Sequence, residues 1–312
     1  MSLGVVCHWL VERSRPRSAP IMVNALDEKK LMLGVYRAGG YTRQRIADTY
    51  VHNAESLLAL LRDYVVPAGV KCYRISSSLF PLSDLVGDDI FDEHARIIDA
   101  LRKIGNLARE HSVRLTMHPG QFCVLSSARE DVVRNAVAEI ERHAWVFETM
   151  GMPKSPYAAI NVHGGVRGGA DALCHGIDML SSGARSRLTL ENCESAYGID
   201  ELHPVALRMG VPITWDSHHH TFRGGSLPPS EAHGMALSTW PRHIRPLQHV
   251  ANTEPELADG SFSDRRKHSD YLHAIPEVQL AANNAGEIDL ECECKMKNLA
   301  VFKAVEELGA KL

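Results

Sequence analysis

The 312-residue sequence lacks the features that would place it in a membrane or outside the cell. It contains no apolar run near the ~20 residues that a membrane span needs. The apolar stretch at residues 3–10 has neither a basic leader before it nor a cleavage-type sequence after it. The seven cysteines are odd in number and scattered, which fits reduced thiols better than a disulfide framework. We therefore expect a cytoplasmic protein with no signal peptide and no transmembrane segment.

Excess positive charge and repeated sequence are also missing. The formal net charge of −4 argues against a globally basic nucleic-acid binder but leaves room for a local basic face. We find no low-complexity tract or internal repeat, and a hydrophobic content of 45% allows a substantial core. Barrels of alternating strands and helices commonly reach this length as one unit, so residues 1–312 are expected to form a single domain.

Segments of strand character alternate with segments of helical periodicity along the chain. The clearest amphipathic helices are predicted at residues 43–64, 91–111 and 129–150. The eight predicted strands lie at residues 3–7, 71–77, 114–118, 158–163, 188–192, 212–216, 246–249 and 288–293. Because parallel neighbours need a crossover, this order predicts an α/β fold, a single (β/α)8 TIM barrel, with an open doubly wound sheet as the alternative.

Six of the eight predicted strands end in a side chain that can bind a metal ion. These residues are His118, His163, Glu191, Asp216, His249 and Glu293. Taken singly, a histidine is more often structural and a strand glutamate more often faces solvent. In a parallel barrel, however, the carboxyl ends of all strands meet on the face that carries the active site. We therefore expect the six side chains to converge there.

Three consecutive histidines follow Asp216. A strand that delivers Asp216 at its end and then turns brings His219, three residues further on, to the same side. We interpret His218 and His220 instead as residues that fix the loop or contact the backbone of a substrate. With His219 and His268 included, the donors are too many for one ion and imply two or three divalent metals.

The donor set is imidazole nitrogen and carboxylate oxygen without obvious thiolates, which suits Mn2+, Zn2+, Co2+ or Fe2+. Carboxylates such as Glu191 and Asp216 could bridge two ions. Clusters of this kind suit in-line displacement at phosphorus, and we expect the catalytic residues to be Glu191, Asp216, His249 and Glu293.

The last predicted strand separates acidic from apolar residues by parity. Asp289, Glu291 and Glu293 share one face, and Leu290 shares the other with Cys292 and Cys294. In a barrel we expect the acidic face to meet the metal site and the two cysteines to pack in the core; an exposed edge strand is the simpler alternative.

Basic residues follow the predicted strand ends, where they could track a phosphate backbone. They are Arg167, Arg223, Arg265, Arg266, Lys267, Lys295 and Lys297. For any single one, a solvated loop charge is the alternative. Gln121 and Phe122 lie just past His118, and an amide beside an aromatic ring could wedge into a base stack. The alternative for Phe122 is packing beneath its own loop.

Several short motifs in this order resemble the ultraviolet-damage endonuclease family, a family of metal-dependent xylose isomerase-like barrels similar to endonuclease IV. The motifs are Tyr73–Ser77, Leu79–Pro81, Arg114–Phe122, Val162–Gly165, Leu190–Asn192, Trp215–His220, Gln248–His249, His268–Tyr271 and Glu293–Lys297. Any one of them is weak evidence. Together they span nearly the whole chain.

The resemblance implies a ligand set and a group of DNA-binding residues. Up to three ions, typically Mn2+, would be held by His118, His163, Glu191, Asp216, His219, His249, His268 and Glu293. Glu191 would bridge two of them. Gln121 and Phe122 match the family's probing pair, which is inserted at the damaged dinucleotide. With them, we expect the DNA- and lesion-binding residues to include Arg74, Arg167, Arg223, Lys295 and Lys297.

The implied substrate is damaged double-stranded DNA, and the implied enzyme nicks it immediately 5′ to a cyclobutane dimer, a 6-4 photoproduct or an abasic site, leaving a 3′-hydroxyl. The resemblance implies no nucleotide cofactor, and we infer no obligate protein partner and a nucleoid-associated location. A sugar isomerase or epimerase of the xylose isomerase type, or a lesion-binding protein that does not cut, are the alternatives.

Three positions depart from the family pattern. Val5 stands where the family has a tyrosine and Trp9 where it has an asparagine, so we expect an altered lesion pocket. Leu247 replaces a lysine two residues before His249, which is modified in some members, and we expect the charge near the metals to change with it.

Overall fold

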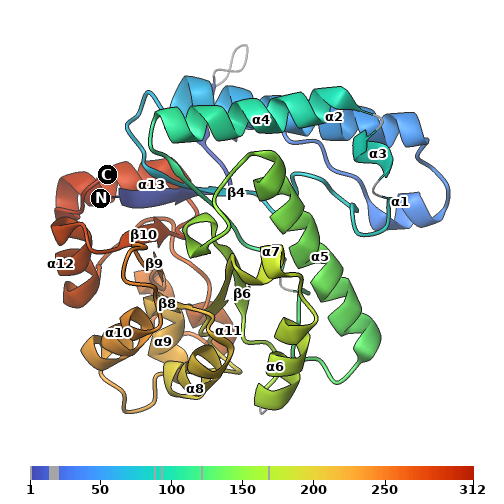
Figure 1. The fold of residues 1–312 in the computed structure, drawn as a ribbon. Helices are drawn as coiled ribbons and strands as arrows, with labels where there is room; N and C mark the ends of the chain where they lie inside the picture. Colours follow the sequence, from blue (N-terminus) through green and yellow to red (C-terminus); the bar gives the residue numbers. More distant parts are fainter. Residues whose placement is uncertain (1, 14–20, 88, 93, 121, 168) are drawn as a thin grey trace.

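The computed structural model describes residues 2–13, 21–87, 89–92, 94–120, 122–167 and 169–312. Eight parallel strands close into a barrel, with helices around its outside (Figure 1). In chain order the barrel strands are β1 (Ser2–Val6), β4 (Cys72–Ile75), β5 (Arg114–Met117), β6 (Ile160–His163), β7 (Leu188–Glu191), β8 (Ile213–Asp216), β9 (Leu247–Val250) and β10 (Asp289–Cys292). Each pairs with its neighbours in this order, and β10 closes the ring on β1. The predicted TIM barrel and its eight strands are confirmed.

The predicted helical segments also form helices. The α-helices are α1 (Leu33–Arg37), α2 (Arg43–Leu60), α3 (Asp89–Asp92), α4 (Ala95–Glu110), α5 (Glu130–Thr149), α6 (Ala170–Asp178), α7 (Ser182–Arg185), α8 (Ile199–Met209), α9 (Ser217–Arg223), α10 (Pro229–Ser238), α11 (Phe262–Arg265), α12 (Glu277–Ala285) and α13 (Lys297–Leu308). A π-helical turn (Leu61–Val65) extends α2, and 3-10 turns lie at Pro156–Ala158 and Pro255–Leu257. No helix in the described parts of the chain is both long enough and apolar enough to cross a membrane.

Local chemistry explains where several helices begin, end and cross. Thr42 caps α2 by accepting a hydrogen bond from the Arg45 amide at 3.1 Å. Gly210 ends α8 with a φ of 64°, a left-handed conformation that favours glycine. Helices α4 and α5 approach each other at Gly105, where an added Cβ would lie 1.7 Å from the main-chain oxygen of Met150. Only glycine permits that approach.

The segment after β1 differs from the long loop that its sequence predicts. Leu10–Arg13 (β2) pairs antiparallel with Ile21–Asn24 (β3). The side chain of Asn298 on α13 holds this pair by accepting from the Leu10 amide at 2.7 Å and donating to the Leu10 carbonyl at 3.1 Å. Because the last residues of β2 are exposed, the pair lacks the apolar alternation that would reveal it in the sequence.

The two substituted positions near the N-terminus are buried in the hydrophobic core. Val5 is fully buried within β1. Trp9 is also buried, and its ring packs 6.3 Å from that of Tyr64 and 5.7 Å from that of Phe302, measured between centroids. The chain turns Trp9 toward the outer helices, and the expected change in the lesion pocket stays a prediction.

An ion network closes the amino-terminal end of the barrel. The buried guanidinium of Arg114 lies 3.0 Å from the Asp289 carboxylate and donates to the carbonyls of Pro156, Tyr157 and Arg245 at 2.8–2.9 Å. Asp289 begins β10, so it lies at the opposite end of the strand from Glu293. The expectation that every acid on this face meets the metal site is therefore wrong for Asp289, since four residues of strand span roughly 13 Å.

Candidate metal centre

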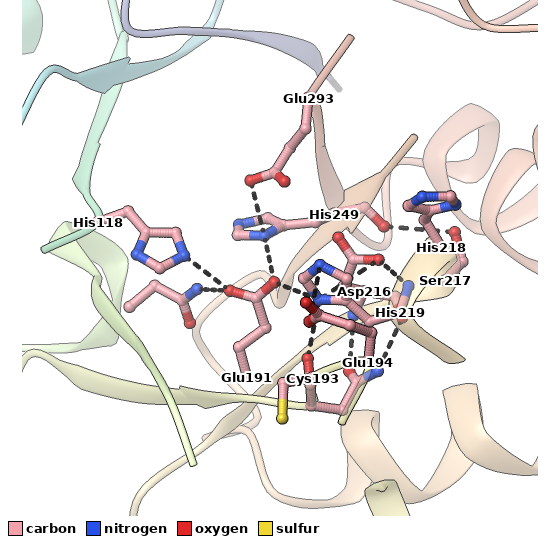
Figure 2. Close-up of polar contacts among 12 residues, drawn as sticks. His118, Glu191, Cys193, Glu194, Asp216, Ser217, His218, His219, His249 and Glu293 are labelled. Carbon is pink, nitrogen blue, oxygen red and sulfur yellow. Dashed lines mark hydrogen bonds and ion pairs between the residues drawn. The ribbon is translucent and has the colours of Figure 1, made fainter. Parts of the chain in front are cut away.

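Glu191, the last residue of β7, lies at the centre of the histidine-rich face of the barrel (Figure 2). Its side chain is fully buried. One carboxylate oxygen, Oε2, is 3.0 Å from His118 Nε2 and accepts from the Asn161 amide. The other oxygen, Oε1, is 3.2 Å from His219 Nδ1 and 3.3 Å from His249 Nδ1. Three imidazoles from separate segments thus surround one carboxylate.

Two groups of potential metal ligands share Glu191. The first contains His118 and His163, and the second contains Asp216 and His249. Within each group the potential ligand atoms all lie within 4.8 Å of one another. Glu191 is therefore placed to serve two neighbouring cation sites.

Buried polar atoms without hydrogen-bond partners in the described structure mark these two sites. They include Glu191 Oε1, Asp216 Oδ2, His163 Nδ1 and His249 Nδ1. Leaving such atoms unsatisfied costs about 1–3 kcal/mol each. A divalent cation would satisfy several at once, and nitrogen and oxygen donors suit Mn2+, Zn2+, Co2+ and Fe2+. The residues present therefore fit a divalent metal centre.

Glu293, which directly follows β10, and His268 lie next to these two groups of potential ligands. Together with His219, the two groups and these two residues form the metal cluster. Glu293 Oε1 is 3.3 Å from His249 Nδ1, and Glu293 Oε2 is 3.7 Å from His268 Nε2. The Nδ1 atom of His268 makes a 3.0 Å hydrogen bond with the Glu293 main-chain oxygen, which directs its Nε2 atom into the cluster. The structure thus brings together all eight side chains expected to hold metal ions.

The turn after β8 places Asp216 and His219 on one side. Asp216 caps α9, because its Oδ1 atom accepts from the His219 amide at 2.7 Å. The Asn192 side chain fixes this turn by bonding the Asp216 main-chain amide and carbonyl at 2.8 and 2.9 Å. His220 has a structural role instead: its Nε2 atom is 3.0 Å from the Leu227 carbonyl, and its ring meets Trp215 edge-on.

Electrostatics holds the cluster together as carboxylate and imidazole pairs. Burial lowers the pKa of His249, but the charges of Glu191 and Glu293 outweigh it and raise that pKa to about 10. Burial lowers the pKa of His163 to about 4, which keeps its ring neutral. Metal ligation requires a neutral imidazole, so binding at His249 must release a proton.

The residues expected to contact DNA lie in different environments. Phe122 is 82% exposed in the loop that follows His118, whereas Gln121 lies outside the described residues. Arg167 is exposed, with a 3.3 Å bond to the Ser195 carbonyl. Lys295 is exposed and 3.5 Å from Asp270.

Two further cations are paired with acids. Arg223 is held by Glu201 at 2.7 Å. Arg74 is only 4% exposed, and its guanidinium pairs with Glu293 and lies 3.4 Å from Glu291. Arg74 was expected to bind DNA. Its burial contradicts that expectation, because its charge is paired with carboxylates inside the barrel. Lys297 is half-buried, with a φ of 49° at the start of α13.

A cleft of about 380 Å³ opens beside the cluster, lined in part by His163, His219, His268, Arg266 and Lys267. Glu194 also lines it and lies 2.8 Å from Arg266 and 3.9 Å from His219 Nε2. Glu194 was not among the residues expected from the sequence, although it follows Glu191 by three residues. The side-chain amides of Asn161 and Asn192 were not expected to have a role either, because no sequence spacing singles them out.

Leu247 contributes neither charge nor a ligand to the cluster. Its buried side chain packs with Cys72, Ala159, Trp240 and Ile244. The expected effect of this substitution on the charge near the metals stays a prediction.

Comparison with known proteins agrees with this geometry. Residues 24–311 match the family described as UV-endonuclease UvdE. A UV DNA damage endonuclease from Nostoc sp. is 34% identical over 264 residues, which are 82% of this chain and 77% of that protein. A UV DNA damage endonuclease from Deinococcus radiodurans is 32% identical over 266 residues, 83% of this chain and 84% of that protein.

Solved structures share the fold. The crystal structure of SacUVDE has a TM-score of 0.76 at 24% identity and covers 91% of this chain and 94% of its own. Endonuclease IV from Thermus thermophilus has a TM-score of 0.54 at 12% identity and covers 80% of this chain and 93% of its own. Because the family match spans most of the sequence and two relatives exceed 30% identity, the chain belongs to the UV-endonuclease UvdE family.

Proposed function

We propose that the protein is a metal-dependent repair endonuclease that nicks damaged double-stranded DNA immediately 5′ to cyclobutane dimers, 6-4 photoproducts and abasic sites. The observation that carries the proposal is Glu191, which joins two groups of potential metal ligands beside an open cleft. The relatives named UV DNA damage endonuclease support the same substrate class.

Two or three divalent ions, Mn2+ foremost, would be held by the eight clustered side chains. When bound, such ions neutralise charge on a phosphodiester and lower the pKa of an attacking water. Glu191, Asp216 and His249 are buried and Glu293 is nearly so, which keeps the donor atoms of these four residues away from bulk water. His118 and His268 are partly exposed, and His268 lines the cleft through which a substrate would approach.

Exposed residues after the carboxyl ends of the barrel strands support a DNA ligand in two ways. Arg167 and Lys295 are exposed cations that can follow phosphates without sequence preference. Phe122 exposes an aromatic ring in the loop after β5, which suits insertion into a base stack weakened by a lesion. A sugar isomerase would need neither feature, and its binding would show almost no dependence on salt.

The test uses ultraviolet-irradiated supercoiled plasmid and the Mn2+-loaded protein. We expect conversion to open circles for irradiated plasmid and none for unirradiated plasmid. A duplex carrying one defined lesion and a labelled end then locates the nick, which we expect directly 5′ to the lesion with a 3′-hydroxyl. Equal persistence of both plasmids at every divalent metal tried would refute the proposal.

Two variants assign roles within it. Glu191→Gln should abolish nicking while DNA binding persists, because it removes the charge shared by both ligand groups. Phe122→Ala should reduce cleavage at bulky photoproducts more than at abasic sites, and Phe122→Tyr is its matched control. Equal losses on both lesions would contradict the wedge.

A further inference from the structure

Glu291 is another fully buried carboxylate, located within β10 beneath the metal cluster. Its Oε1 atom accepts from the Thr116 hydroxyl and lies 3.7 Å from Cys72 Sγ. Its Oε2 atom is 3.1 Å from His249 Nε2 and 3.4 Å from Arg74 Nε. Glu291 therefore touches residues of β4, β5 and β9 and is sealed from solvent.

The ring of His249 lies between carboxylates on opposite sides. Its Nδ1 atom is 3.3 Å from both Glu191 Oε1 and Glu293 Oε1. Its Nε2 atom faces Glu291 instead. Glu291 belongs to neither group of potential ligands, whereas Glu191 belongs to both. The two nitrogens thus have separate surroundings, one facing the cluster and one facing the barrel interior.

We propose that Glu291 is a positioning residue. Its carboxylate pairs with Nε2 of His249 and thereby leaves Nδ1 as the nitrogen that faces the metal ions. The inference rests on the proposed metal centre. A carboxylate behind a ligating imidazole fixes the tautomer and ring orientation and increases the basicity of the ligand nitrogen. Without Glu291, the ring could present either nitrogen.

Arg74 makes a charged Glu291 tolerable in the barrel interior. A buried carboxylate needs both a counter-charge and hydrogen bonds. Arg74 supplies the charge, and Thr116 supplies a hydroxyl donor. The same guanidinium pairs with Glu293, so one cation ties the positioning carboxylate to a carboxylate of the cluster. Arg74 is therefore buried between two carboxylates and is not exposed to solvent.

Asp289 provides a matched control on the same strand. It lies two residues before Glu291 on the same face, and it is also buried and paired with arginines, Arg114 at 3.0 Å and Arg245 at 2.8 Å. Within the described chain, its ion pairs and side-chain hydrogen bonds join it to these arginines and to none of the eight potential ligands. Asp289→Asn therefore removes an equivalent charge without disturbing His249.

The experiment measures metal affinity directly. Metal-free wild-type protein, Glu291→Gln and Asp289→Asn are titrated with MnCl2 and CoCl2 by calorimetry, and the cobalt absorption spectrum reports the ligand geometry. We expect Glu291→Gln to weaken affinity about 10- to 100-fold and to alter the cobalt spectrum. Asp289→Asn should lower the melting temperature but leave affinity and spectrum unchanged. Equal affinities in the two variants, or no metal binding by the wild-type protein, would overturn the inference.

A crystal structure of the Mn2+-loaded wild-type protein provides a test that needs no variant to fold. We expect the metal to be bonded to His249 Nδ1, with Glu291 on Nε2. Coordination through Nε2, or by Glu291 itself, would contradict the positioning role. Neither measurement uses DNA, so a protein that binds metal as expected but leaves irradiated plasmid intact would refute the proposed activity and leave this inference standing.

Discussion

His143 on α5 makes the stability of the protein depend on pH in a way that its structure quantifies. The ring is buried, and its Nδ1 atom lies 2.7 Å from the Glu139 main-chain oxygen. Burial lowers the pKa of His143 to about 4, and the nearby charges of His118 and Arg142 act in the same direction. An unfolded histidine has a pKa of about 6.5.

Between these two pKa values the unfolded chain binds a proton that folded His143 does not. Acidification therefore favours unfolding, and stability falls as the pH drops below about 6.5 until it levels off near the folded value. From about pH 7.5 to about pH 4.5, the difference in pKa corresponds to a loss of about 2.5 kcal/mol from this residue alone. Burial also lowers the pKa of His163 to about 4, so the comparison must cancel the contribution of that residue.

Comparison with His143→Gln cancels such contributions, since this variant keeps a polar side chain at position 143 that cannot titrate. Urea unfolding of metal-free wild-type protein and His143→Gln is measured at a series of pH values. We expect the free energy of unfolding to fall by about 2.5 kcal/mol more in the wild-type protein over that pH range. Parallel pH profiles for the two proteins would refute the reasoning, because they would show that folded His143 takes up its proton as readily as the unfolded residue.

Three further outcomes follow from the barrel and its metal cluster. Arg114→Met should lower the free energy of unfolding by about 3–5 kcal/mol, because it leaves the buried Asp289 short of a partner. Adding Asp289→Asn should restore part of this loss. Chemical denaturation measures both variants. Gly105→Ala should strongly destabilise the protein, because the added Cβ would overlap the Met150 carbonyl. At Gly34 an added Cβ meets nothing within 4 Å, so Gly34→Ala should be neutral or slightly stabilising in the same assay. Mn2+ at about 100 times its Kd should stabilise the protein by about 2.7 kcal/mol per independent site, and a chelator should reverse the rise in melting temperature; no shift would contradict a resident metal centre.

The order of elements and the convergence of the potential metal ligands were predictable from the sequence for one physical reason. Parallel strands joined by helices place all their carboxyl ends on one face. A ligand at the end of a strand, such as Glu191 or Asp216, therefore has its position determined by topology before any packing is known. The spacing from Asp216 to His219 is equally local, since one helical turn after a cap returns to the same side.

Contacts between distant segments could not be read in this way. Parity placed Asp289, Glu291 and Glu293 on one face, but their three separate environments depend on which strands lie opposite each layer of the barrel. The antiparallel pair β2 and β3 depends on Asn298, nearly the whole chain away, and the burial of Trp9 depends on Phe302 in the same helix.

Periodicity and the chemistry of single side chains were enough to predict the fold class, the eight strands and the potential metal ligands at their ends. How the charges are shared among those residues depends on the folded barrel instead. The fold turned Arg74 from an expected DNA contact into a buried partner of two carboxylates, and it placed Glu291 behind His249. Such assignments require the closed barrel, since only closure brings β4, β9 and β10 within the few ångströms over which buried charges act on one another.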